Sequence, residues 1–198
     1  MEIEELLILV GRILRAGTYQ RMPWKNGGGT TTEIFKSTGA DGQVHWRLSI
    51  ADVASDGPFS EFPGIDRWIM MVEGKGMELT ISGLGTRRIE KPFEPLAFSG
   101  DAKTDCRLID GPIRDFNLMV ARGHAQGGLE VVTLSAGETR TFEREVAALH
   151  VLDGCVERAG DVLAVGDTLI AEGSAIATVS APRPTRLAAI TLQTKPRA

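Results

Sequence analysis

The 198-residue sequence has few of the residues from which metal sites are built. Its three histidines are His45, His124 and His150, and no His-x-His or His-x-x-x-His pair can be formed from them. A borderline metal requires imidazole or thiolate ligands that converge from neighbouring strands. Cys106 and Cys155 lie outside any Cys-x-x-Cys pair, which indicates isolated reduced thiols. The sequence therefore predicts no bound metal and no other cofactor.

Basic clusters, long apolar runs and common catalytic motifs are also absent. The formal net charge is −4 and the pI is near 5.5, which argues against a nucleic-acid or anionic-membrane partner. The apolar run at residues 6–10 is too short for a signal sequence or a membrane span. No Gly-x-Ser-x-Gly elbow, Walker loop or dinucleotide fingerprint is found. We expect a cytoplasmic protein that binds a small molecule or another protein. The sequence also leaves open whether the protein forms a homodimer.

Alternation with period two is the main structural signal of the sequence. It is clearest in "VHWRLSIADV", residues 44–53, where Arg47 and Ser49 share the polar face. "DRWIMMVEGKGMELTIS" predicts two strands that form a hairpin at Gly74-Lys75-Gly76. No stretch has long helical periodicity. The pattern predicts an all-β protein with a sandwich or barrel architecture.

A weak internal repeat indicates two β-barrel units in tandem. Glu73-Gly74 and Asp153-Gly154 each follow a mostly apolar strand, and each is followed by a second Gly-Asp pair, at residues 100–101 and 166–167. Glycine and polar residues interrupt the strands at residues 121–128. We therefore predict an N-terminal barrel at residues 12–123 and a C-terminal barrel at residues 124–198, with some strands exchanged between them.

The segment "RMPWKNGGGTTTEI", residues 21–34, is the first candidate for a binding site. Three consecutive glycines indicate a backbone with unusual dihedral angles or a close approach to another group. Trp24 supplies a flat apolar wall, Lys25 a cation and Asn26 a bifunctional amide, which together suit a small planar carboxylate. The alternative is a wide β-bulge or a connecting loop that binds nothing.

Polar faces of two strands supply the other candidates. If the face of residues 44–53 lines a barrel interior, Arg47 is available for bidentate recognition of a carboxylate; if it faces solvent, Arg47 is a surface charge. "GPIRDFNLMVARG" places Asp115, Asn117 and Met119 on one face. Asp115 can orient a cation, and Glu33 can pair with one. The predicted ligand-binding residues are Trp24, Lys25, Asn26, Glu33, Arg47, Ser49, Asp115, Asn117 and Met119.

Several of these segments resemble the HutD/Ves family of bacterial proteins. The resemblance rests on "MPWKNGGGTTTEI", "WRLSIADVASDGPFSEFPGIDRWIMMVEGKGMEL", "PFEPLAFSGD" and "GPIRDFNLMVARG", which cover most of residues 12–123. It implies a double-cupin (bicupin) fold of two jelly-roll barrels without the usual cupin metal ligands. It also implies a regulatory protein of histidine catabolism that binds a small carboxylate such as urocanate or formylglutamate.

Two other functions remain open at this stage. One is a metal-independent hydrolase, isomerase or lyase that acts on a related small acid, with Glu33 or Asp115 as general base. The other is a protein-interaction subunit whose barrel is packed shut by Trp24, Trp46 and Met119. Burial of the carboxylates and the state of the barrel interior discriminate between them.

Overall fold

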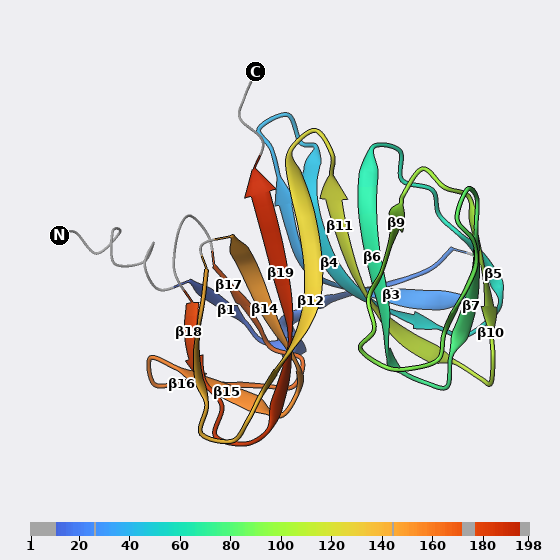
Figure 1. The fold of residues 1–198 in the computed structure, drawn as a ribbon. Helices are drawn as coiled ribbons and strands as arrows, with labels where there is room; N and C mark the ends of the chain where they lie inside the picture. The colour runs from blue at the N-terminus through green and yellow to red at the C-terminus, as the bar shows by residue number, and fades with distance from the viewer. Residues whose placement is uncertain (1–10, 26, 144, 172–176, 195–198) are drawn as a thin grey trace. The chain divides into compact units, whose positions relative to one another are not determined.

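The chain folds into β-sheets throughout the part that the computed structural model describes, which is residues 11–25, 27–143, 145–171 and 177–194 (Figure 1). Two compact units are distinguished. One is Tyr19–Gln126 with Thr194, and the other combines the described residues of Met1–Thr18 with Gly127–Gln193. The described ranges contain one short 3-10 helix, η1 (Ala16–Thr18), and no helix long and apolar enough to cross a membrane. The all-β prediction is confirmed.

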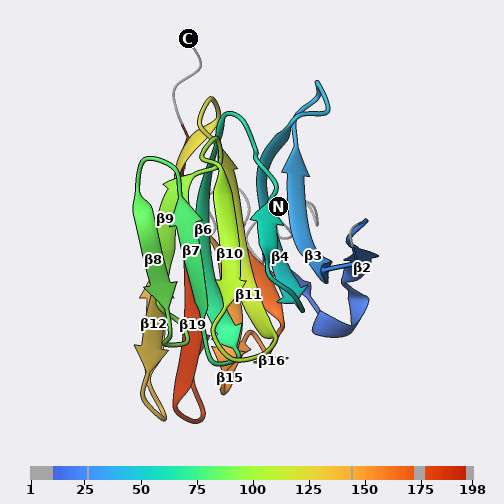
Figure 2. The same ribbon diagram turned by 90° about the vertical axis from the view of Figure 1, so that its right-hand side faces the viewer.

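The Tyr19–Gln126 unit consists of two antiparallel sheets. The larger, in spatial order, contains β2 (Gln20–Pro23), β3 (Gly29–Thr38), β4 (Val44–Val53), β11 (Ile113–Ala121), β6 (Ile65–Glu73) and β9 (Leu96–Ser99). The smaller contains β5 (Gly57–Phe59), β10 (Thr104–Leu108), β7 (Met77–Ile81) and β8 (Gly85–Ile89). Figure 2 shows β7, β8 and β10 side by side.

The other unit repeats this arrangement. Its larger sheet contains β1 (Arg12–Leu14), β17 (Thr168–Ile170), β14 (Val146–Asp153), β19 (Thr185–Thr194) and β12 (Ala125–Leu134). Its smaller sheet contains β13 (Thr139–Phe142), β18 (Ala177–Ser180), β15 (Cys155–Arg158) and β16 (Asp161–Ala164). The order β4-β11-β6-β9 recurs as β12-β19-β14-β17, and β5-β10-β7-β8 recurs as β13-β18-β15-β16. The strand β1, near the start of the chain, pairs with β17.

The two acidic-glycine pairs of the internal repeat occupy equivalent places. Gly74 follows β6 and Gly154 follows β14, with φ values of 112° and 82° in the left-handed region. A Cβ at Gly74 would lie 3.0 Å from the Cα of Ile113, and one at Gly154 would lie 2.8 Å from the Cα of Thr185. Both glycines therefore let the chain pass tightly against the first residue of the neighbouring strand, β11 or β19.

The predicted hairpin at Gly74-Lys75-Gly76 is wrong. β6 pairs with β11 and β9, whereas β7 pairs with β10 and β8, so the chain crosses from one sheet to the other at these glycines. A hairpin needs two neighbouring strands of one sheet, whereas β6 and β7 belong to different sheets. The second part of the repeat also fails, because Gly100 follows β9 while Gly166 precedes β17.

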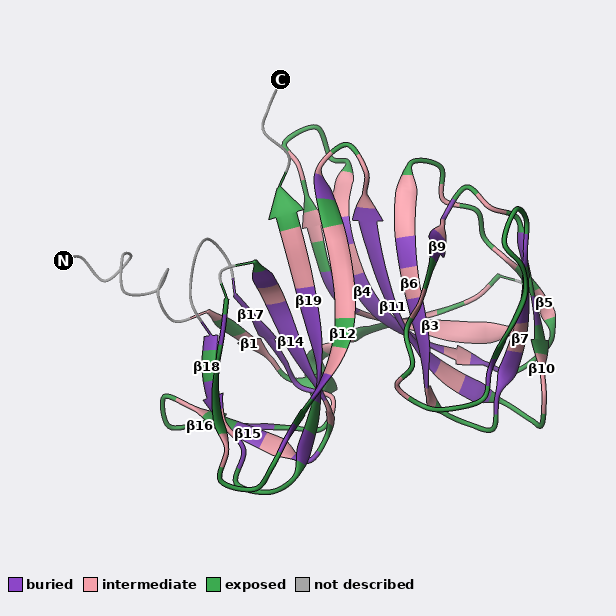
Figure 3. Ribbon diagram, in the orientation of Figure 1, coloured by how far each residue is buried: buried purple, intermediate pink, exposed green. Residues whose placement is uncertain are grey.

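Buried apolar residues form a core cluster in each unit, and Figure 3 shows the buried residues in purple along the strands. In the Tyr19–Gln126 unit the core includes Ile69 and Met71 of β6 with Met77, Leu79 and Ile81 of β7. These side chains are at most 2% exposed, and burying each contributes about 1.5–3 kcal/mol. Arg67 points to the same face of β6 as Ile69 and Met71, so the inner face changes from apolar to polar along this strand.

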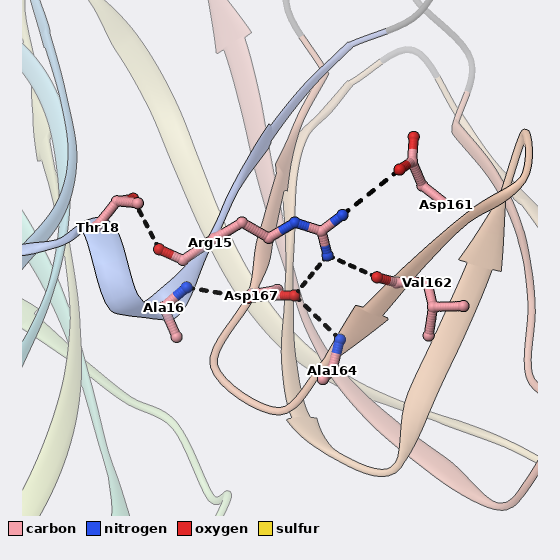
Figure 4. A network of polar contacts seen from close by, with 7 residues as sticks. All are labelled: Arg15, Ala16, Thr18, Asp161, Val162, Ala164 and Asp167. Carbon is pink, nitrogen blue, oxygen red and sulfur yellow. Dashed lines mark hydrogen bonds and ion pairs between the residues drawn. The ribbon is translucent and has the colours of Figure 1, made fainter.

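An ion pair holds the segment after β1 to the turn before β17 (Figure 4). Asp167 accepts hydrogen bonds from Arg15 Nη1 (2.8 Å) and from the backbone N–H groups of Ala16 (2.9 Å) and Ala164 (3.1 Å). Arg15 also donates to the carbonyl oxygen of Val162 (2.6 Å). Burial alone would raise the pKa of Asp167, but these hydrogen bonds outweigh it and hold the pKa below its ordinary value. The first strand is thereby fixed at the edge of its sheet.

Candidate functional site

Three neighbouring strands place a grid of side chains on the inner face of the six-stranded sheet. β11 lies between β4 and β6, and alternate residues of all three strands point to this face. The register aligns three rows across the strands: Arg47, Met119 and Arg67; Ser49, Asn117 and Ile69; Ala51, Asp115 and Met71. Charged and amide groups are therefore concentrated at one end of the barrel interior.

A cavity of about 500 Å³ lies over this polar region, a size that suits a small-molecule ligand. The predicted residues that line it are Trp24, Lys25, Arg47, Ser49, Asp115, Asn117 and Met119. Glu33 lies against Arg47 instead, and Asn26 lies outside the described residues. Trp46 packs against Phe35 on the opposite face of β4, with ring centroids 4.6 Å apart. The barrel is thus not packed shut by the three side chains considered from the sequence.

Arg67 is a buried cation of the cavity and is only 5% exposed. Its Nη2 donates to Asn117 Oδ1 at 3.0 Å, and its guanidinium carbon lies 5.0–5.8 Å from the ring centroids of Phe59, Phe62 and Phe98. Burial lowers the pKa of Arg67 to about 10, and the charge of Asp115 opposes that shift. Arg67 therefore remains a cation at neutral pH, and its buried Nε has no hydrogen-bond partner.

Asp115 is the carboxylate nearest to this cation in the network. Asn117 links the two, because its Nδ2 donates to Asp115 Oδ1 while its Oδ1 accepts from Arg67. Burial raises the pKa of Asp115 to about 7, against the opposing effects of Arg67 and of the hydrogen bond from Asn117. Its second oxygen, Oδ2, is buried without a partner. The side chain is 1% exposed, so its protonation state changes near neutral pH in a protected environment.

Arg47 is held at the other end of its row by an ion pair. Its Nε donates to Glu33 Oε2 at 2.8 Å, and both side chains are 18% exposed. Glu33 also contacts Lys36 Nζ at 3.5 Å. Because Glu33 engages the Nε of Arg47, the terminal amino groups of this guanidinium are not used by that hydrogen bond.

The glycine-rich segment forms a tight turn that positions Trp24. The N–H of Trp24 donates to the carbonyl of Gly29 (2.9 Å), and the N–H of Gly27 donates to the carbonyl of Trp24 (3.1 Å). Gly27 has a φ of 73°, and a Cβ at Gly29 would lie 3.0 Å from the indole ring. The indole Nε1 donates to Thr31 Oγ1 at 2.8 Å. The glycines thus allow the ring to lie against the backbone at the cavity wall, while Lys25 beside it is exposed.

Sequence reasoning missed Arg67, Phe59 at the end of β5, and the loop residues Ser60 and Phe62, which also line the cavity. A signal for Arg67 was present, because "IDRWIMMVE" puts it on the same face as Ile69 and Met71. A charge on an otherwise apolar face indicates a buried polar site. The loop residues have no periodic pattern that could reveal which way they point.

Asp115→Asn is expected to flatten the dependence of stability on pH between about pH 4 and pH 7. The unfolded carboxyl releases its proton near pH 3.9, whereas the folded one keeps it up to about pH 7. The contribution of Asp115 to the free energy of unfolding therefore falls as the pH rises through this window, on the order of 2–4 kcal/mol in total. Urea midpoints measured from pH 4 to pH 8 test this, with the exposed Asp105→Asn as control. Parallel curves for native protein and Asp115→Asn would contradict it.

The donor set of the cavity does not fit a divalent cation. Lys25, Arg47 and Arg67 are all positively charged, and Asp115 is the one carboxylate among the described lining residues. No group of three or more His, Cys, Asp or Glu residues in the described part of the chain could hold a metal ion. His45 and His124 stack on each other, with centroids 3.8 Å apart, and do not line the cavity. The arrangement suits an anion that takes hydrogen bonds from guanidinium groups.

Comparison with known proteins identifies relatives of this chain. It is 49% identical over 112 residues to a 21.2 kDa protein in the hutC 3′ region of Pseudomonas putida, an alignment that spans 56% of this chain and 58% of the relative. It is 32% identical over 152 residues to the protein Ves of Citrobacter koseri, over 75% of this chain and 77% of the relative. The chain thus spans under two thirds of the Pseudomonas putida protein.

Solved structures agree with this relationship. HutD from Pseudomonas fluorescens SBW25 (formate condition) has 36% identity and a TM-score of 0.78, covering 92% of this chain and 98% of that protein. A cupin 2 conserved barrel domain protein from Leptotrichia buccalis has 13% identity and a TM-score of 0.59, over 88% and 96%, and shares the fold alone. The double-cupin prediction is confirmed. A family model described as HutD matches residues 16–189, and the chain therefore belongs to the HutD family.

Proposed function

We propose that this chain binds a small carboxylate in the cavity and acts as a regulatory protein of histidine catabolism. The observation that carries the proposal is the buried guanidinium of Arg67. Among the described residues, no carboxylate lies within ion-pair distance of it, and Asp115 reaches it only through Asn117. A buried charge without a direct counterion is costly, so an anionic ligand would stabilise it.

The neighbouring groups suit the rest of such a ligand. Arginine presents its donors in a planar fork that matches a carboxylate, and a low-dielectric site strengthens charged hydrogen bonds. Arg67 and Arg47 would bind the acid, Trp24 would form an apolar wall, and Asn117 would orient a polar group. Lys25 would lie at the exposed rim.

Membership of the HutD family supports the link to histidine utilisation, and one relative is encoded in a hutC 3′ region. The regulatory role would follow if the cavity senses an intermediate of that pathway. Urocanate, with one carboxylate and an imidazole, and formylglutamate, with two carboxylates and a formamide, are the ligands we propose first, because each has at least one carboxylate and a polar group beyond it.

A thermal-shift panel tests the proposal. It contains urocanate, formylglutamate, formiminoglutamate, glutamate and formate. A ligand at 100 times its Kd should raise the melting temperature by roughly 5–10 °C, since it adds about 2.7 kcal/mol to the folded state of a domain of this size. Arg88→Gln, an exposed charge change on β8, should respond like the native protein. No shift with any of the five acids would argue against the proposal.

A metal-independent enzyme is the second candidate, and the raised pKa of Asp115 favours it. A carboxylate that titrates near pH 7 is suited to act as a general base. NMR spectra of the same acids, recorded over hours with purified protein, separate the two functions. Formation of product that is lost in Asp115→Asn would favour the enzyme, whereas saturable shifts without product would favour the binding protein.

A further inference from the structure

The cavity contains two arginines at opposite ends of one row. Arg47 on β4 and Arg67 on β6 are both aligned with Met119 on the intervening β11. Neighbouring strands are about 4.8 Å apart, so the two Cα atoms are separated by roughly 10 Å. Both side chains line the same cavity. They are close enough for the charge of Arg47 to contribute to the lowered pKa of Arg67.

Neither arginine is fully neutralised by the protein. Arg67 reaches its nearest carboxylate through an amide, and Arg47 shares Glu33 with Lys36. The two guanidinium groups line one cavity, and their positive charges repel each other. A ligand with a single carboxylate neutralises the positive charge at one end of the row. A ligand with two carboxylates neutralises the positive charges at both ends and so removes more of the repulsion.

The surface between the two cations is apolar. Met119 is 8% exposed and lies in the middle of the row, and no charged side chain stands between Arg47 and Arg67 in the register. A thioether offers contact to a hydrocarbon chain and hydrogen-bonds only weakly. The row therefore has the order cation, apolar contact, cation.

We propose that the ligand is a short α,ω-dicarboxylate that bridges Arg67 and Arg47 across Met119. This inference rests on the proposed function, which requires only that the cavity binds a carboxylate. One carboxylate would bind the buried guanidinium of Arg67, the other would take the terminal amino groups of Arg47, and the carbon chain would lie over Met119. The cavity of about 500 Å³ has room for such a molecule.

A series of unbranched acids tests the proposal on the native protein. Butyrate, valerate and caproate are compared by calorimetry with succinate, glutarate and adipate, which have the same numbers of carbon atoms, at pH 7 and low salt. At least one diacid should bind tenfold or more tightly than its matched monoacid, because each charged hydrogen bond strengthens binding by about a factor of ten. Equal affinities within each pair would overturn the dicarboxylate inference and leave carboxylate binding intact. Absence of binding by all six acids would overturn both proposals.

Arg47→Gln provides the site-specific test. It should weaken binding of the diacid about tenfold more than binding of the matched monoacid, which removes the advantage of the diacid. In Arg47→Gln the carboxylate of Glu33 loses its counterion and could itself repel an acidic ligand. The double variant Glu33→Gln/Arg47→Gln removes that carboxylate, so it separates loss of the cation from repulsion by Glu33. The diacid should have no advantage over its matched monoacid in the double variant either. Arg88→Gln is the matched control. An undiminished diacid advantage in the double variant would overturn the bridge.

Discussion

Arg67→Met is expected to weaken carboxylate binding at least a hundredfold while leaving the free energy of unfolding within about 1 kcal/mol of the native value, or higher. The loss of binding corresponds to about 2.7 kcal/mol, because the variant removes both the charge and its fork of donors. The fold is retained because Arg67 has no direct carboxylate partner to leave behind. Replacing a buried charge with an apolar side chain of similar length is often neutral or stabilising.

The surroundings of Arg67 support this separation of binding from stability. Three phenylalanine rings pack around its guanidinium and would contact a thioether equally well. In Arg67→Met the Oδ1 atom of Asn117 loses the hydrogen bond from Arg67. Asp115 loses a nearby positive charge and therefore stays protonated to a higher pH. These costs offset part of the gain from removing the buried cation.

Calorimetric titration and urea denaturation of the same preparations measure the two quantities. Arg88→Met makes the same change on an exposed strand and should alter neither. Arg67→Lys keeps the charge without the planar fork, so its affinity should lie between those of native protein and Arg67→Met. Affinity of Arg67→Met within threefold of native would remove Arg67 from the binding site, and a loss of several kcal/mol of stability would show that the cation serves the fold.

Gly154→Ala should lower the free energy of unfolding by roughly 2–4 kcal/mol. Gly154 has a φ of 82°, where any residue with a Cβ pays about 1–2 kcal/mol. Its new methyl group would also lie 2.6 Å from the carbonyl oxygen of Pro184 and 2.8 Å from the Cα of Thr185. Backbone atoms at the start of β19 cannot rotate away as a flexible side chain can, so the strand pairing must shift.

Gly137→Ala is the matched control for the backbone strain. Gly137 lies in the same unit with a φ of 79°, but nothing lies within 4 Å of the position of an added Cβ. It should cost only about 1 kcal/mol. Chemical denaturation gives the loss of unfolding free energy for each variant. The difference between the two losses measures the cost of the close contact with Pro184 and Thr185. Equal losses would show that this close packing does not contribute to stability.

Period-two alternation correctly grouped the side chains of the cavity floor. Arg47 and Ser49 share one face of β4, and Asp115, Asn117 and Met119 share one face of β11, as the sequence predicts. The pattern could not reveal whether those faces line an interior or meet water. Arg67 was missed because the middle of its strand, residues 68–72, is apolar on both faces, so Arg67 did not stand out as part of an alternating pattern.

The hairpin predicted at Gly74-Lys75-Gly76 shows a second limit. The strands and the need for glycine follow from local sequence, but the partner of each strand does not. β7 pairs with β10, whose residues follow it in the chain by more than twenty positions, and β6 pairs with β11 at a longer range. Glycine permits the left-handed turn and its close packing against Ile113, whereas the sheet that β7 joins is set by its pairing with β10 and β8.

By itself, the sequence determined that this protein consists of strands, that its histidines cannot form a paired metal site, and which side chains share a face of each strand. These properties depend on residue type and on a period of two, both of which are local. The tertiary structure alone decided that the polar faces of β4, β11 and β6 meet over one cavity and that Arg67 is buried there. Those outcomes depend on strand pairing between distant segments, and on what covers a face, which no local pattern contains.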